Sequence, residues 1–135
     1  MQKFAFSFVL VALLGVLPSC KQVVYAPMYQ KGTVSHVVLC YLKNPGSAAD
    51  RQKILEATRP LREIPGVYDI EVGYALPSDR PVVVSDYDVG MVATFRDEAA
   101  MRAYLNHPKH RQAVKDVLEP LTSKIVVYDF VNQEY

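Results

Sequence analysis

Two of the three histidines in this chain lie close to a tyrosine, in the segment Tyr104-Leu105-Asn106-His107-Pro108-Lys109-His110. The third, His36, opens an apolar stretch. Imidazole and phenol groups are the side chains that proteins use to move protons near neutral pH. A carbonyl compound that enolises needs a base to take its proton and a donor to hold the developing oxyanion. We therefore treat Tyr104, His110 and His36 as candidate catalytic residues, with His110 as base and Tyr104 as donor.

Each of these residues also has a structural alternative. Tyr104 could be a core aromatic on a helix face whose hydroxyl finds one partner. His110 could be a hydrogen-bonded helix end, and His107, which precedes Pro108, is interpreted as a structural residue at a helix junction. His36 either faces the helices, in which case Val37 and Leu39 face the other way, or it points into a dimer interface.

A metal site is a weaker hypothesis. The pattern His107-x-x-His110 together with His36 could supply three nitrogens, but no carboxylate or cysteine has a fitting spacing. We expect no metal. The chain also has no glycine-rich phosphate loop, no nucleophile elbow and no CxxC pair, so we expect no nucleotide, flavin or other cofactor.

The N-terminus has the pattern of an export signal. Residues 1–19 contain one positive charge, at Lys3, and then an uncharged apolar run that is too short to span a bilayer. The run ends in Leu17-Pro18-Ser19-Cys20, which resembles a bacterial lipobox and predicts that Cys20 is lipidated and becomes the new N-terminus. An ordinary secretory signal cleaved nearby is the alternative. We expect a location in the bacterial cell envelope, anchored by lipid to a membrane.

Residues 20–32 then form a lipidated cysteine and a tether, which reaches at most about 40 Å when extended. Removing residues 1–19 takes away Lys3, one of the 15 basic residues, and none of the 14 acidic ones, so that 14 of each remain. A neutral chain has no basic field that would recruit nucleic acid. Cys40, in an apolar run, is predicted to be a buried core thiol without a disulfide partner.

Residues 33–135 are the right size for one domain with one core. The patterns predict strands over 34–42, 68–74, 89–96 and 124–131, a helix that begins after Ser47 and is interrupted at Pro60, a helix over 98–105, and a further helix from Pro108. Residues 76–88 are predicted to be a long loop. This order is that of an α+β, ferredoxin-like fold, with an antiparallel sheet and helices on one face.

The strands are apolar on both faces, with Val37, Leu39 and Tyr41 alternating with Val38 and Cys40. Helices cover only one face of such a sheet, so the other face needs a second cover. A second copy of the sheet would provide it, and we therefore expect a homodimer.

Five segments in order, SHVVLCYL, IPGV, YDVGMVATF, AYLNHPKH and VVYDF, resemble the stress-responsive α/β-barrel (Dabb) domains over 35–130. The resemblance implies a ferredoxin-like protomer and a dimer whose two sheets form an α/β barrel. One plant member closes a linear tetraketide by aldol condensation, and its catalytic tyrosine and histidine match Tyr104 and His110. Its strand-opening histidine matches His36. Members often carry another histidine where this chain has Val89, so one polar group of the pocket is missing here.

The sequence thus predicts a membrane-tethered lipoprotein that binds a small apolar molecule in a pocket between helices and sheet. One alternative is an enzyme that acts on a carbonyl compound through Tyr104 and His110. Another is a structural stress-response dimer whose core contains no cavity.

Overall fold

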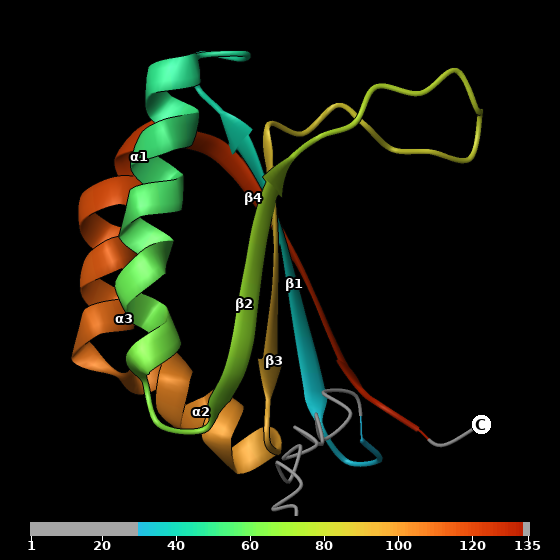
Figure 1. Cartoon of the computed structure of the whole chain (residues 1–135). Coiled ribbons are helices and arrows are strands. Elements are labelled where there is room, and N and C mark those ends of the chain that lie inside the picture. Colours follow the sequence, from blue (N-terminus) through green and yellow to red (C-terminus); the bar gives the residue numbers. More distant parts are fainter. Residues whose placement is uncertain (1–29, 134–135) are drawn as a thin grey trace, which may run out of the picture.

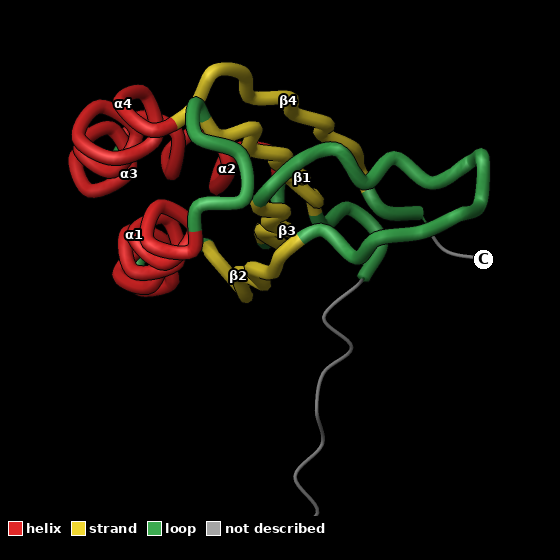
Figure 2. Tube along the Cα trace, turned by 90° about the horizontal axis from the view of Figure 1, so that it is seen from above, coloured by secondary structure: helices red, strands yellow, loops and turns green. Residues whose placement is uncertain are grey.

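The sheet is the centre of the fold. A computed structural model describes residues 30–133, so the proposed signal peptide, Cys20 and most of the tether lie outside the described residues. The four strands are wholly antiparallel in the order β2-β3-β1-β4, which places β1 between two neighbours. Their bounds are β1 Val34–Leu42, β2 Val67–Tyr74, β3 Val89–Phe95 and β4 Thr122–Val131. All helices lie on one face of this sheet (Figures 1 and 2), so the predicted fold class is confirmed.

The helices begin and end where the sequence signals predict. Helix α1 (Ala48–Thr58) begins at Ser47, whose hydroxyl accepts a hydrogen bond from the Asp50 amide. It ends before Pro60, which lies in the first turn of the 3-10 helix η1 (Arg59–Glu63) because proline fits a helix start but not a helix interior. Helix α2 (Glu98–Asn106) is capped by the side chain of Asp97.

The last helical segment differs from the single regular helix that the sequence predicts. It consists of α3 (Pro108–Ala113), a π-helical turn η2 (Val114–Leu118) and a short α4 (Glu119–Leu121). Apolar residues three and four apart are compatible with either winding, so their spacing does not reveal the π turn. Among residues 30–133 no helix is long and apolar enough to cross a membrane.

The core lies between the helices and the side of the sheet that faces them. From β1 it receives Val34, Val38 and Cys40, which meet Phe95 and Tyr104. Burial raises the pKa of Cys40 to about 11, so its thiol is neutral at physiological pH. The prediction that Cys40 is a buried core residue is confirmed, whereas its pairing with Cys20 is not tested because Cys20 lies outside the described residues.

The opposite side of the sheet, here called the open face, is apolar and has no cover within the described chain. Its apolar side chains, which point away from the helices, are Val37, Leu39 and Tyr41 of β1, Val92 of β3, and Val126, Tyr128 and Phe130 of β4. The register places the polar residues Ser35, Thr94 and Glu71 on the same side. Tyr128 and Phe130 are more than half exposed, at 59% and 52%. A soluble monomer seldom leaves such a contiguous apolar surface in water.

Residues 75–88 form the predicted long loop, and Asp88 fixes its end. The Asp88 carboxylate accepts hydrogen bonds from the amides of Leu42 and Gly46 and pairs with Arg51 at 3.0 Å. Burial raises the pKa of Asp88, but the two amide bonds and Arg51 outweigh burial and lower the pKa below its ordinary 3.8. One carboxylate thus joins the loop to the end of β1 and to α1.

We predict that Asp88→Asn lowers the free energy of unfolding by about 3 kcal/mol, because it removes a buried charge and leaves Arg51 without its partner. Chemical denaturation measures this, with Asp86→Asn as the matched control, since Asp86 is exposed and accepts only a 3.3 Å bond from Tyr41. Because the folded pKa of Asp88 is depressed, its contribution is complete above pH 3.8 and is lost as the pH falls through the lowered value. If Asp88→Asn and Asp86→Asn had equal free energies of unfolding, Asp88 would not be the residue that holds the loop to β1 and α1.

Candidate functional site

The fold brings Tyr104, His110 and His36 together from three elements. The ring centroids of Tyr104 and His110 are 4.5 Å apart, and those of Tyr104 and His36 are 6.4 Å apart. His36 and Tyr104 are buried, with Tyr104 fully inaccessible. His36 therefore faces the helices, and Val37 and Leu39 face the other way, which is the arrangement that the pocket hypothesis requires.

Local sequence signals at the starts of α2 and α3 determine the positions of Tyr104 and His110. Asp97 begins α2 so that Tyr104 lies in its last turn, on the face that packs against Phe95. His107 begins α3 by accepting a hydrogen bond from the Lys109 amide, which agrees with its interpretation as a structural residue. Pro108 occupies the first helical position, and His110 follows within the first turn.

The Tyr104 hydroxyl is a buried polar group without a partner in the described part of the chain. Burial raises its pKa to about 12, so the group remains protonated and able to donate. A buried hydroxyl that makes no hydrogen bond costs roughly 1–3 kcal/mol. An unpaired buried hydroxyl therefore calls for an explanation. A bound molecule that accepts a hydrogen bond from it is one explanation, which the neighbouring side chains can support or oppose.

The surroundings of His110 favour the neutral imidazole, with one ring nitrogen free to act as a base. Its Nδ1 lies 3.2 Å from the carbonyl oxygen of Leu105, which can only accept, so Nδ1 carries the proton. Nε2 is then the basic nitrogen. Burial lowers the pKa of His110 below its ordinary 6.5, the Leu105 bond partly opposes this, and the nearby His36 adds to the lowering.

Asp129 belongs to this cluster and was not predicted from the sequence. It lies directly across from His36 in the β1–β4 ladder, and its Oδ1 is 2.6 Å from His36 Nδ1. A carboxylate can only accept, so this contact places the proton on Nδ1 and orients the ring. The one sign of it in the sequence is that Asp129 is an acidic residue within the apolar run of the last strand. Its pairing with His36 becomes evident only when the β1–β4 register is known.

Next to this cluster, the edge strand β4 exposes part of its helix-facing side. Three apolar side chains on the helix-facing side of β4 are partly exposed, Ile125 at 36%, Val127 at 45% and Val131 at 48%. Asp129, on the same side of the strand, is 42% exposed at its side chain. The helices therefore leave this edge of the sheet uncovered next to the His36–Asp129 pair.

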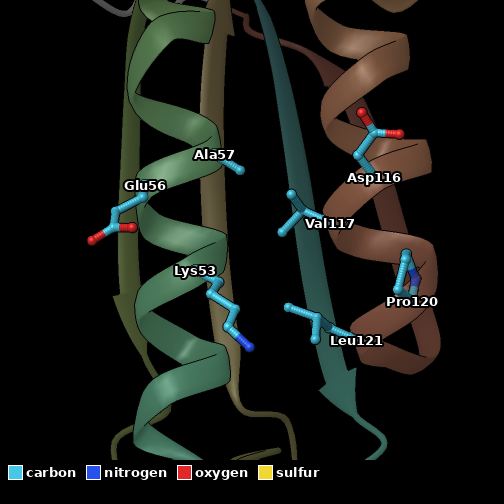
Figure 3. A pocket seen from close by; sticks show the side chains of 7 residues that line it. All are labelled: Lys53, Glu56, Ala57, Asp116, Val117, Pro120 and Leu121. Atoms are coloured by element: carbon cyan, nitrogen blue, oxygen red, sulfur yellow. The ribbon is translucent and has the colours of Figure 1, made fainter.

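Four cavities among the described residues lie elsewhere. One, of about 400 Å³, lies between α1 and the η2–α4 segment, with Ala57, Val117 and Leu121 among the side chains that line it (Figure 3). The others lie against the sheet near Tyr87, beside Arg62, and next to Pro60. Tyr104, His110 and His36 line none of these four cavities.

No metal centre forms from these histidines within residues 30–133, where no group of three or more histidine, cysteine or acidic side chains is placed to hold an ion. His107 uses its Nδ1 for the α3 cap, which removes it from the three-nitrogen set considered above. Val89 is buried in the core and adds no polar group.

The sheet order and the single layer of helices define a ferredoxin-like protein. Residues 34–132 match the family model of the stress responsive A/B barrel domain (Dabb). The chain belongs to this family. Comparison with curated protein sequences gives no match.

Solved structures agree with this assignment. A Dabb family protein with a ferredoxin-like fold from Mesorhizobium loti is 30% identical, with a TM-score of 0.63, over 77% of this chain and 100% of its own. A dimeric ferredoxin-like protein of unknown function from Jannaschia sp. CCS1 is 26% identical, with a TM-score of 0.59, over 73% of this chain and 98% of its own. A hydroxynitrile lyase from Passiflora edulis shares the fold at 20% identity, with a TM-score of 0.67, over 78% and 98% of the two chains. Because the described residues correspond to whole chains of such proteins, we take residues 30–135 to fold on their own.

We predict that the His110 imidazole titrates with a midpoint below 6.5 in NMR spectra of residues 30–135, because burial disfavours its charged form. His36→Gln should raise the midpoint, since it removes a nearby group that opposes the charge, whereas His107→Gln should leave it unchanged. The unfolded chain binds this proton more readily, so stability should fall as the pH drops from 6.5 through the lowered value. A midpoint at or above 6.5 would contradict the buried, neutral assignment.

Proposed function

We propose that this protein is a membrane-tethered lipoprotein whose Dabb domain binds a small, mostly apolar molecule between the helices and the sheet. Tyr104, His110 and His36 would be the polar contacts of that molecule. The observation that carries the proposal is the fully buried Tyr104 hydroxyl, which has no partner among the described residues. An acceptor oxygen on a ligand would satisfy it.

The surroundings of the hydroxyl support a ligand of this kind. The rings of Phe95 and His110 both pack against the Tyr104 ring, with centroids 4.8 and 4.5 Å from its own, so its neighbours are largely aromatic. A few convergent polar groups in an apolar environment are typical of small-molecule sites. Entry along the uncovered β4 edge would bring the molecule past Asp129 to His36.

Catalysis on a carbonyl compound is a second candidate, and the tautomer of His110 favours it. The bond to Leu105 leaves Nε2 as the basic nitrogen, next to a tyrosine that can donate. His110 Nε2 would take the proton from the carbon next to the carbonyl, and the Tyr104 hydroxyl would hydrogen-bond the resulting enolate oxygen. The proton on Nε2 would return to carbon or to the product oxygen. In a purely structural dimer, the third hypothesis, the unpaired hydroxyl would have no role.

We further propose that the domain functions as a homodimer joined through its open faces. The apolar side chains there support this, and the Jannaschia relative is described as dimeric. The pattern Leu17-Pro18-Ser19-Cys20 supports the lipid anchor and a place in the bacterial cell envelope. The anchor would hold the domain by the segment that leads into β1.

For the anchor, we predict that Cys20→Ser in the full chain, expressed in a bacterial host, abolishes labelling by radioactive palmitate and releases the protein from the membrane fraction. The acylated cysteine would be the only apolar attachment left after signal cleavage. Cys40→Ala is the matched control and should keep the label, because Cys40 is buried in the core. Label as strong in Cys20→Ser as in wild type would contradict the anchor.

For the site, we predict that aryl and alkyl ketones bind residues 30–135 in ligand-observed NMR, and that Tyr104→Phe weakens this binding about tenfold by removing one hydrogen bond. Tyr128→Phe, which removes an exposed hydroxyl from the open face, should have no effect. The thermal stability of Tyr104→Phe should be equal to or greater than that of wild type, because the lost hydroxyl has no protein partner.

The same NMR samples in deuterated water separate binding from catalysis. Exchange of the ketone α-protons that is lost in His110→Ala would support the acid–base reaction, and binding without exchange would support binding alone. Ketone affinity that is unchanged in Tyr104→Phe would contradict the proposed site.

A further inference from the structure

The loop between β2 and β3, residues 75–88 and here called the arm, exposes large apolar side chains. Leu76 is 81% exposed, Val82 87% and Val84 62%. These three are more exposed than any other large apolar side chain of the described chain. A loop of this length without helix or strand usually has a function of its own.

The base of the arm is fixed in place at the open face. Besides the Asp88 contacts, the Asp88 amide bonds the Cys40 carbonyl at 2.9 Å, and Asp86 accepts from the Tyr41 hydroxyl. The Tyr87 ring lies against Gly90, where an added Cβ would approach it to 3.2 Å. Since Tyr41 is an open-face residue and Tyr87 lines the shallow cavity that also contains Val37 and Val92, the arm is continuous with that face.

The arm extends away from the helices, on the open side of the sheet, in both views of the molecule (Figures 1 and 2). A molecule seated on the open face would therefore lie beside the arm and within reach of its apolar side chains. The arm cannot cover its own sheet in this conformation, because Leu76, Val82 and Val84 remain exposed.

We propose that the arm of each protomer packs Leu76, Val82 and Val84 onto a second copy of this chain. This inference rests on the proposed homodimer and assigns the arm to its interface. Continuity of the arm with the open face favours a second copy as the partner.

A lipid surface is the other occupant for such side chains, and the arm and the tether lie at opposite ends of β1. The tether enters at the start of β1, where Val34 pairs with Phe95, whereas the arm leaves at the other end, where Cys40 pairs with Val89. Six residues of strand separate the two points by roughly 20 Å. A lipid anchor would thus attach at the end of the sheet opposite to the arm, but the extended tether is longer than this separation, so the vesicle experiment below distinguishes the two occupants.

Sedimentation velocity on residues 30–135 tests the arm. Wild type should dimerise at micromolar concentration, and the triple variant Leu76→Ser, Val82→Ser, Val84→Ser should raise the dissociation constant about 100-fold through lost apolar burial. The matched control replaces three exposed helix residues, Glu56, Gln112 and Lys115, with serine and should behave as wild type. Because all six side chains are exposed, circular dichroism should show the same fold in both variants.

The outcomes separate this inference from the homodimer proposal. Wild type that stays monomeric throughout the micromolar range would overturn both. A dimer whose dissociation constant is unchanged by the triple variant would overturn the arm inference and leave the homodimer standing.

A photo-crosslinking residue at position 82, in a mixture with isotope-labelled protein, gives a direct readout. Crosslinks between labelled and unlabelled chains support the arm. Crosslinks found only to lipid, with phosphatidylethanolamine–phosphatidylglycerol vesicles present, would overturn it in favour of a membrane contact.

Discussion

The alternation of side chains along β1 determines what each layer of this protein contains. β1 pairs with both β3 and β4, so its residues face one of two layers with no freedom to rotate. One set, His36, Val38 and Cys40, enters the core beneath the helices. The other, Val37, Leu39 and Tyr41, forms the centre of the open face. A shift of one residue would remove His36 from Tyr104 and expose the core.

The β4 strand connects the two surfaces that the proposals involve. Asp129 reaches His36 on the helix side, and its neighbour Phe130 lies on the open face. A partner seated on the open face would therefore fix the strand that orients His36. Dimerisation through the open face would in this way be linked to the geometry of the site through two consecutive residues of one strand.

The sequence was informative where a local physical rule decides the structure. Strand alternation, the capping residues Ser47 and Asp97, and the interruption at Pro60 predicted the elements within a few residues, and the apolar open face followed from two-sided strands. The grouping of Tyr104 with His110 and His36 was implied by the resemblance to the Dabb family, and strand alternation alone left two orientations open for His36.

The features that the sequence did not reveal depend on the pairing of distant strands or on a local change from α-helical to π-helical winding. Asp129 reaches His36 only in one register of the β1–β4 ladder, and the π turn at Val114–Leu118 has the apolar spacing of an ordinary helix. The position of the cavities also depends on how the helices pack, which residue spacing does not determine. Neither the three bonds that Asp88 accepts nor the direction of the arm has a signature in the local sequence.

The proposed binding site depends on a ligand that accepts the hydrogen bond of the Tyr104 hydroxyl. Crystals of residues 30–135, grown from protein purified without added compounds and then also soaked in a ketone, can show whether such a ligand is present. We expect non-protein density with an acceptor atom about 2.7–3.2 Å from Tyr104 Oη, in contact with His110. A hydroxyl that bonds a protein group in both crystals, with no density beside it, would contradict this proposal.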